Sequence, residues 1–304
     1  MGTPDFAVPC LEALNTNGYD VTLVITQPDR PKGRDRKVTP PPVKTAALRL
    51  GYEVIQPLSI GANDFIAHIA GLKADIFVVV AFGHILPKTL LELPRLGAIN
   101  LHASLLPKYR GPAPIQWAII NGEIETGVTV ICMDEGLDTG DILRFEKVEI
   151  TPEDTSAILH DCLSELSAAL LIRTLNDLEA GRLKAVPQDH TRATYAPLLK
   201  KSDGRVDWNM PAEKLEAFIR GMTPWPGAFT FHGNKRLKIF KAIPALMKGE
   251  EPPGTVIQGF SDELRIATGK GALSVLEIQG ESGKRLMIKD FLRGYELPPG
   301  TVFS

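Results

Sequence analysis

Cysteine is scarce in this 304-residue chain, which contains Cys10, Cys132 and Cys162 and no C-x-x-C pair. An odd number without paired spacing argues against a disulfide framework and a zinc cluster, so we expect three buried thiols and no metal. Long apolar runs are missing too, because no stretch reaches the roughly 18 apolar residues of a membrane helix. Nor does a basic and apolar leader open the chain. These absences predict a soluble, cytoplasmic protein without membrane contact.

Two catalytic signatures are also absent. The sequence contains no G-x-G-x-x-G motif, which speaks against a dinucleotide-binding domain for hydride transfer. It contains no G-x-S-x-G motif either, so a serine nucleophile on a strand-to-helix turn is not expected.

Composition and length indicate a globular protein of more than one domain. Hydrophobic residues make up 44% of the chain and charged residues 23%, which is ordinary for a soluble globular protein. A chain of 304 residues favours two domains over one.

Apolar stretches alternate with helix-like stretches through the first part of the chain. Strands are predicted at 21–25, 52–55 and 75–81, and helices at 8–14, 43–50 and 63–72. Further strands are predicted at 127–133 and 142–150, before a long helix over about 155–180. Such alternation favours a doubly wound, mainly parallel α/β sheet. We expect this domain to cover residues 1–182.

The last third of the chain has a different pattern. Periodicity disappears over 183–203, where polar, proline-bearing sequence predicts a linker. A second domain is expected at 204–304, with a helix at 211–220 and strands at 228–231, 237–242, 254–258, 263–267 and 273–278. Five short strands at this spacing suggest a small barrel, of which an OB-like barrel is one kind.

Three polar residues form a candidate reaction site. Asn100 and His102 stand two residues apart after an apolar run, so on a strand both side chains point to one face. Asp138 lies in the turn-rich stretch 135–141. An imidazole can accept a proton from an attacking amine, an amide can donate to an oxyanion, and a carboxylate can orient the imidazole. This set suits direct acyl transfer between two bound substrates, since none of the three is a good covalent nucleophile here.

A structural interpretation of the same residues is the more common one. Polar residues at strand ends usually serve as cap or turn partners, and an aspartate before Thr-Gly is ordinary turn chemistry. From these three residues alone, both interpretations stay open.

Longer sequence phrases identify a family. The segment 100–117 resembles the signature of the 10-formyltetrahydrofolate-dependent formyltransferases, and the resemblance continues through 2–9, 26–31, 78–87, 133–141 and 224–227. It implies a Rossmann-like formyltransferase fold followed by an OB-like domain that helps to hold tRNA. It also implies that 10-formyltetrahydrofolate is the co-substrate and that methionine carried by initiator tRNA is the acceptor. We expect the chain to act as a monomer.

The resemblance assigns roles residue by residue. Asn100, His102 and Asp138 match the catalytic triplet of the family. The folate-binding segments of the family match Phe82, Gly83, Ile85, Leu86, Pro87, Ser104, Leu105, Leu106 and Pro107. Core packing is the alternative for Ile85, Leu86 and Leu105, and we expect it to hold for at least one of them.

A basic stretch at 27–42 is the second informative region. It contains Arg30, Lys32, Arg34, Arg36 and Lys37. Its composition alone predicts a solvated, mobile loop. The resemblance implies a loop that becomes ordered on initiator tRNA, with its basic residues on phosphates.

The start of the chain departs from the family pattern. Family members have a short apolar strand before the Gly-Thr-Pro turn, whereas Met1 here directly precedes that turn. We expect a sheet without this strand and a less stable domain.

Other functions are compatible with the same triplet. It could hydrolyse formyltetrahydrofolate, or formylate a small amine such as a nucleotide sugar or glycinamide ribonucleotide. The predicted barrel and the basic stretch argue against both, because small substrates need neither. A nucleic-acid-binding module without activity is disfavoured by the intact triplet.

Overall fold

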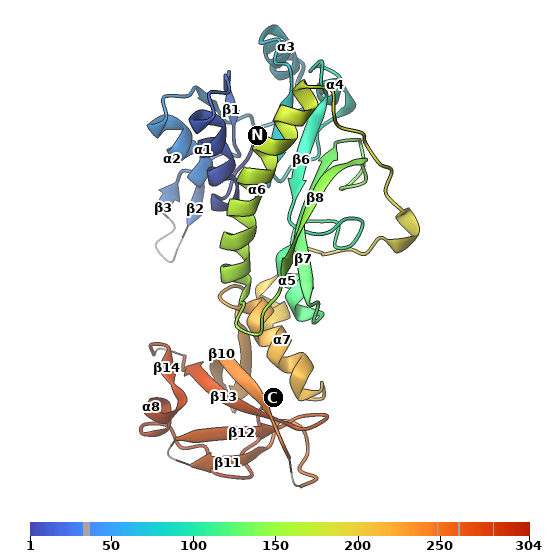
Figure 1. Ribbon diagram of the computed structural model, residues 1–304. Coiled ribbons are helices and arrows are strands. Elements are labelled where there is room, and N and C mark those ends of the chain that lie inside the picture. The colour runs from blue at the N-terminus through green and yellow to red at the C-terminus, as the bar shows by residue number, and fades with distance from the viewer. Residues whose placement is uncertain (33–36, 248, 261, 282) are drawn as a thin grey trace. The chain divides into compact units, whose positions relative to one another are not determined.

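The computed structural model describes residues 1–32, 37–247, 249–260, 262–281 and 283–304, which form two compact units (Figure 1). The first unit comprises Met1–Pro114, Glu125–Glu149 and His160–Pro197. The second comprises Ile115–Ile124, Ile150–Leu159 and Leu198–Ser304. The domain boundaries predicted at 182 and 203 stay predictions.

Strands of the first unit follow the predicted α/β pattern. Strand β1 (Val24–Ile25) pairs in parallel with β4 (Val54–Ile55), and β5 (Phe77–Val80) pairs in parallel with β6 (Ala98–His102). Antiparallel strands β7 (Glu125–Cys132) and β8 (Ile142–Glu149) extend the sheet beyond β6. The apolar, β-branched sequence of β5 suits a strand buried on both faces.

Helices flank these strands. They are α1 (Val8–Thr16), α2 (Pro42–Arg49), α3 (Asn63–Gly71), α4 (Lys88–Leu91) and α6 (Ser156–Glu179), with short 3₁₀ turns at Asp5–Ala7 and His190–Arg192. Figure 1 shows α1 and α2 beside β1, and α6 alongside β8. Ion pairs Arg144–Asp177 and Arg173–Glu146 join α6 to β8. Across the described part of the chain, no helix is both long and apolar enough to cross a membrane.

Met1 and Gly2 run between β1 and β5. The Gly2 amide donates to the Ile25 carbonyl at 3.0 Å, and the Val80 amide donates to the Met1 carbonyl at 2.9 Å. Burial lowers the pKa of the Met1 ammonium to about 5, and its nitrogen lies 2.7 Å from the Val78 carbonyl oxygen. Of the described residues, only Met1 and Gly2 join β1 to β5 through backbone hydrogen bonds. A cavity of about 760 Å³ lies beside them. The lower stability predicted for this domain stays a prediction.

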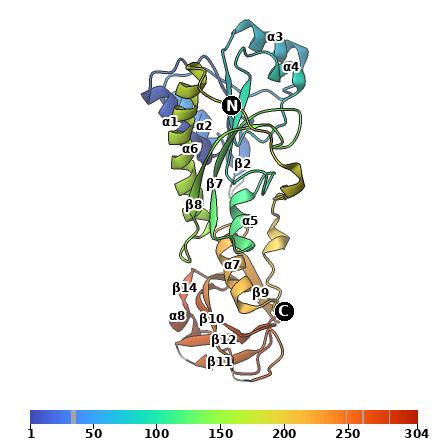
Figure 2. The same cartoon turned by 45° about the vertical axis from the view of Figure 1, so that its right-hand side comes forward.

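The second unit contains an antiparallel sheet. Its strands are β9 (Ala228–His232), β10 (Lys235–Ala245), β11 (Val256–Phe260), β12 (Glu263–Ala267), β13 (Ala272–Gln279) and β14 (Leu286–Met287), in the order β11-β12-β13-β10-β9 with β14 on β13. The helices that complete the description are α5 (Pro114–Ile120), α7 (Ala212–Met222) and α8 (Ile288–Leu292), with a 3₁₀ turn at Lys201–Gly204. Helix α7 buries Leu215, Ile219 and Met222, and Figure 2 shows it beside β9 and β10. OB-like closure stays a prediction.

The basic stretch is more regular than expected. Instead of a loop throughout, β2 (Arg30–Lys32) and β3 (Lys37–Thr39) form an antiparallel pair. Backbone hydrogen bonds between the two strands stabilise the pair, although the charged composition of this stretch is unfavourable for strands. Arg34 and Arg36 lie outside the described residues.

The expectation of three buried thiols was wrong for two of them. Cys10 is buried, Cys132 is half-buried and Cys162 is exposed. Cys162 lies on α6 between the buried Leu159 and Leu163, but it points to the solvent side of the helix. Burial raises the pKa of Cys10 to about 12, which keeps this thiol protonated and unreactive.

Two helical glycines allow a matched test of packing. A Cβ at Gly221 of α7 would lie 2.6 Å from Ile120 Cγ1 and 3.0 Å from the Gln116 carbonyl oxygen, whereas a Cβ at Gly71 of α3 would meet nothing within 4 Å. We expect Gly221→Ala to lower the free energy of unfolding by about 1–3 kcal/mol through overpacking. Gly71→Ala should raise it by up to about 1 kcal/mol. Urea unfolding measures both, and equal effects would contradict the packing at Gly221.

Candidate functional site

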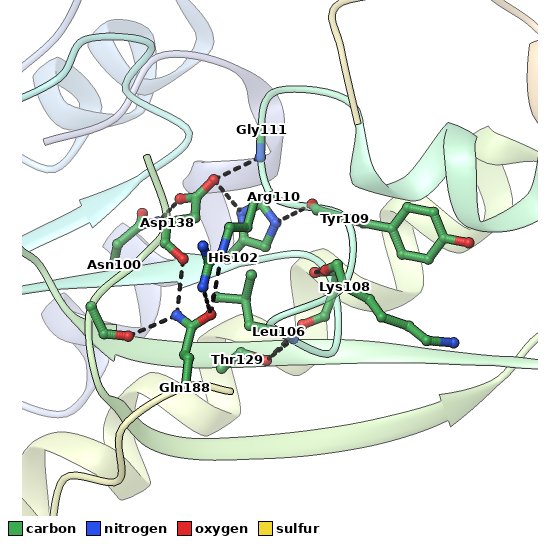
Figure 3. Close-up of polar contacts among 12 residues, drawn as sticks. Asn100, His102, Leu106, Lys108, Tyr109, Arg110, Gly111, Thr129, Asp138 and Gln188 are labelled. Atoms are coloured by element: carbon green, nitrogen blue, oxygen red, sulfur yellow. Dashed lines mark hydrogen bonds and ion pairs between the residues drawn. The ribbon is translucent and has the colours of Figure 1, made fainter. Parts of the chain in front are cut away.

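Strand β6 brings two of the three predicted catalytic side chains to one face. Asn100 and His102 are the third and fifth residues of the strand, and both approach Asp138 (Figure 3). His102 is 6% exposed and Asn100 is half-buried. The polar pair therefore lies at the carboxyl end of a central strand, where open α/β sheets bind ligands.

Asp138 occupies a strained turn between β7 and β8. Its φ is +54°, in the left-handed region that non-glycine residues rarely adopt. Asn100 Nδ2 donates to Asp138 Oδ1 at 3.3 Å, and the Gly111 amide donates to Oδ2 at 2.8 Å. His102 Nδ1 lies 3.5 Å from the same Oδ2. The turn thus brings the carboxylate against both side chains of β6 and against the loop that follows them.

The hydrogen bonds of His102 define its orientation. Nε2 lies 2.8 Å from the Tyr109 carbonyl oxygen, and because a carbonyl only accepts, Nε2 carries a proton. The other ring nitrogen, Nδ1, faces Asp138. A proton that leaves or reaches this imidazole during a reaction therefore does so at Nδ1.

The predicted folate loop after β6 is tied to β7. Thr129 Oγ1 donates to the Ser104 carbonyl at 2.6 Å and accepts from the Leu106 amide at 3.2 Å. Ser104 Oγ donates to the Lys108 carbonyl at 2.6 Å. Leu106 is buried, while Leu105 and Pro107 are half-buried. The loop is consequently fixed by buried hydrogen bonds next to the triplet.

The second predicted folate segment combines anchors with an exposed apolar residue. Phe82 and Leu86 belong to a core cluster with Ile25, Ile69, Phe77, Val79, Leu90 and Ala98. Leu86 therefore packs in the core, as expected for at least one such residue. Ile85 is 62% exposed, Gly83 is exposed and Pro87 is half-buried.

Thr3, near the start of the chain, and Gln27, just after β1, bind the backbone of the 82–87 segment. Thr3 Oγ1 and Gln27 Nε2 both donate to the Phe82 carbonyl, at 3.1 and 3.0 Å. A Cβ at Gly83, whose φ is +81°, would lie 2.5 Å from Gln27 Nε2. Gly83 thus provides both the left-handed turn and the space that Gln27 needs.

The predicted tRNA-binding residues lie on the β2–β3 hairpin. Arg30 and Lys37 are exposed, and Lys32 ends β2. At the start of the hairpin, Asp29 accepts hydrogen bonds from Gln56 and Lys44, which lower the pKa of Asp29. Within the described residues, no hydrogen bond or ion pair joins Arg30 or Lys37 to the triplet. The hairpin is thus anchored at its base, while Arg30 and Lys37 face solvent.

Sequence reasoning missed three residues that shape the site. Thr129 accepts and donates hydrogen bonds within the predicted folate loop. Gln188 and Arg110, which are 5% and 3% exposed, contact each other beside Asp138. Gln188 lies in the stretch predicted as a linker, where nothing marked it. Arg110 falls within the family signature at 100–117, but the residue types of that segment did not indicate that the Arg110 side chain is buried.

Among the described residues, no group of three His, Cys, Asp or Glu side chains could hold a metal ion.

Comparisons with known proteins cover the whole chain. A family model described as "Formyl transferase" matches residues 1–175, and one described as "Formyl transferase, C-terminal domain" matches residues 198–296. A methionyl-tRNA formyltransferase from Geotalea uraniireducens is 49% identical over 304 residues, which is 100% of this chain and 96% of that protein. The corresponding protein from Pelotomaculum thermopropionicum is 50% identical over 305 residues, with coverage of 100% and 97%.

A solved structure supports the fold. The N-formyltransferase from Helicobacter canadensis, in complex with folinic acid and dTDP-3-aminofucose, aligns with a TM-score of 0.66 over 94% of this chain and 97% of that one. The identity is 19%, so the match concerns the fold alone. With the sheets described above, it confirms the predicted Rossmann-like formyltransferase fold followed by a second, β-rich domain.

Thr129 offers a test of how the predicted folate loop is held. Thr129→Val removes a hydroxyl that bonds two buried backbone groups, and leaving such groups unpaired costs about 1–3 kcal/mol each. We expect urea unfolding to show a loss of at least about 2 kcal/mol. The control Thr39→Val, at an exposed position where Oγ1 donates to the nearby Lys37 carbonyl, should change stability by less than about 0.5 kcal/mol. Equal effects would contradict the buried role of Thr129.

Proposed function

The chain belongs to the formyl transferase family, and we propose that it transfers the formyl group of 10-formyltetrahydrofolate to the α-amino group of methionine on initiator tRNA. The observation that carries the proposal is similarity over the whole chain to methionyl-tRNA formyltransferases at 49–50% identity. The meeting of Asn100, His102 and Asp138 supports it, because these groups suit acyl transfer to an amine.

In the proposed reaction the amine attacks the formyl carbon directly. A new C–N bond forms as the formyl oxygen becomes an oxyanion, and the bond from this carbon to folate N10 then breaks. The proton lost by the amine ends on N10. Asn100 Nδ2 has two N–H groups, and since one is directed at Asp138 Oδ1, the other can donate to the oxyanion.

His102 and Asp138 transfer the proton in this proposal. Nε2 of His102 is committed to the Tyr109 carbonyl, so Nδ1 and the neighbouring Asp138 carboxylate form the path between amine and N10. The Gly111 amide keeps Oδ2 in place beside Nδ1. We infer that the imidazole stays fixed while the proton moves at Nδ1.

The folate would lie between the two predicted segments. Exposed Ile85 offers an apolar surface for the pterin, and Phe82 and Leu86 hold the backbone around Gly83 from the core. On the other side, Ser104, Leu105, Leu106 and Pro107 form a loop fixed by Thr129. Preformed segments of this kind lower the entropic cost of binding.

The acceptor is assigned to tRNA through the hairpin. Exposed cations at Arg30 and Lys37 suit contacts with phosphates, and the sequence adds Lys32, Arg34 and Arg36. We further propose that the enzyme acts in the cytoplasm, as a monomer.

A transfer assay tests the reaction and its residues together. We expect formyl transfer from 10-formyltetrahydrofolate to methionyl initiator tRNA, with little transfer to elongator tRNA, glycinamide ribonucleotide or a nucleotide-linked amino sugar. Asn100→Ala should lower kcat at least about a hundredfold, because one lost oxyanion donor typically costs about 3 kcal/mol. Asp138→Ala should lower kcat to a similar degree, because a group that transfers protons typically contributes about 10²–10⁴-fold. The control Asn209→Ala removes a similar Asn–Asp hydrogen bond at an exposed position and should keep normal turnover. Preference for a small amine, or near-normal turnover in either triplet variant, would refute the assignment.

Salt dependence tests the hairpin. Arg30→Ala or Lys37→Ala should weaken tRNA binding and reduce the slope of log K against log salt by about one unit, since one phosphate contact is lost. Folate binding should not change. Arg95→Ala, which removes an exposed cation already paired with Asp75, serves as the control and should leave the slope unchanged. An unaltered slope in both hairpin variants would contradict the contact with phosphate.

A further inference from the structure

Gln188 uses its whole side-chain amide inside the protein. Its Nε2 donates to the carbonyls of Asp138 at 2.9 Å and Gly140 at 2.7 Å. Its Oε1 accepts from Arg110 Nε at 3.2 Å and from a terminal Arg110 nitrogen at 2.6 Å (Figure 3). Four hydrogen bonds satisfy the two donors and both acceptor sites of a glutamine. A surface residue in a linker would not need this arrangement.

One end of Gln188 holds the Asp138 turn. The two carbonyls that it binds flank Thr139, so together they fix the path of the backbone on both sides of that residue. The turn is tightly confined, since a Cβ at Gly140 would lie 1.7 Å from the Cys132 carbonyl oxygen. The left-handed φ of Asp138 costs free energy. Bonds from outside the turn are therefore needed to keep Asp138 in this conformation.

The other end of Gln188 holds the loop after β6. Arg110 is flanked by Tyr109, whose carbonyl bonds His102 Nε2, and by Gly111, whose amide bonds Asp138 Oδ2. The Arg110 guanidinium also contacts His190 Nδ1 at 3.0 Å.

Backbone bonds strengthen this link. The Arg110 amide donates to the Thr194 carbonyl at 2.8 Å, and the Ala196 amide donates to the Arg110 carbonyl at 2.7 Å. The segment 188–196 thus forms hydrogen bonds both with the Asp138 turn and with the loop after β6. These are the two loops that contact the His102 imidazole and the Asp138 carboxylate.

We propose that Gln188 is a positioning residue of the reaction: through Arg110 on one side and the Asp138 and Gly140 carbonyls on the other, it sets the separation between the Asp138 carboxylate and His102. This inference rests on the proposed function and adds to it a residue outside the triplet. Catalysis depends steeply on such distances, because a misplacement of about 1 Å can cost about a hundredfold in rate.

Gln188→Glu separates the two ends of the side chain. A carboxylate still accepts from Arg110, but it cannot donate to the carbonyls of Asp138 and Gly140. We expect kcat to fall at least tenfold, while KM for either substrate stays close to the value of the unmodified chain. The melting temperature should fall as in Thr129→Val, because two carbonyls lose their donor, so kcat is measured below the melting transition of both chains. Gln188→Met, which has a similar shape and makes no hydrogen bond, is the second variant should the glutamate variant fold poorly. The control is Gln279→Glu, at a half-buried glutamine whose Nε2 donates to the Gly283 carbonyl in a solvent-exposed hydrogen bond.

A double-mutant cycle distinguishes positioning from general support. If Gln188 acts through Asp138, Gln188→Glu should change the residual rate less than twofold in an Asp138→Ala background. The same fold loss in both backgrounds would overturn the proposal.

Hydrogen exchange gives a readout that does not need activity. The Gly111 amide, bonded to Asp138 Oδ2, should exchange at least tenfold faster in Gln188→Glu and Gln188→Met but not in Gln279→Glu. A chain that shows this change but transfers no formyl group would refute the proposed function and leave the positioning of Asp138 supported. Unchanged exchange at Gly111 would overturn the positioning role.

Discussion

The hydrogen bonds that converge on the Asp138 carboxylate are the constraint on which the site depends. Asn100 Nδ2 reaches one oxygen, while the Gly111 amide and His102 Nδ1 reach the other. A carboxylate only 12% exposed must have such partners, because burying a charge without them costs several kcal/mol. The need to satisfy one carboxylate therefore brings strand β6, the loop after it and the β7–β8 turn into one arrangement, and the imidazole is oriented as a result.

Much of the fold could be predicted because local patterns and burial agree there. The apolar run at 75–81 contains β5, and the predicted long helix at 155–180 is α6 to within one residue at each end. In β5 and for most of α6, the side chains that show the pattern are the ones that pack. The pairing of Asn100 with His102 could also be predicted, because side chains two residues apart on a strand point to the same face.

What could not be predicted depends on contacts between residues far apart in the sequence. Gln188 stands 50 residues from Asp138 and 78 from Arg110, and no local pattern separates a buried glutamine from one in a solvated linker. Thr129 looks like any threonine of a strand until Ser104 and Leu106 are placed against it. The β2–β3 pair was hidden by its basic composition, because backbone pairing leaves little trace in side-chain chemistry. Cys162 was misjudged because the apolar pattern of α6 includes residues on its exposed side.

The grip of Gln188 on two distant loops has a consequence for biosynthesis. A nascent chain that has left the ribosome only up to β8 already contains Asn100, His102, Arg110 and Asp138, but it lacks the glutamine that joins their loops. Contacts across 50 and 78 residues form only after long loops have closed. Competence for the reaction should therefore arise late in folding, when the segment after α6 docks. Recovery of activity would then report a later event than formation of the sheet.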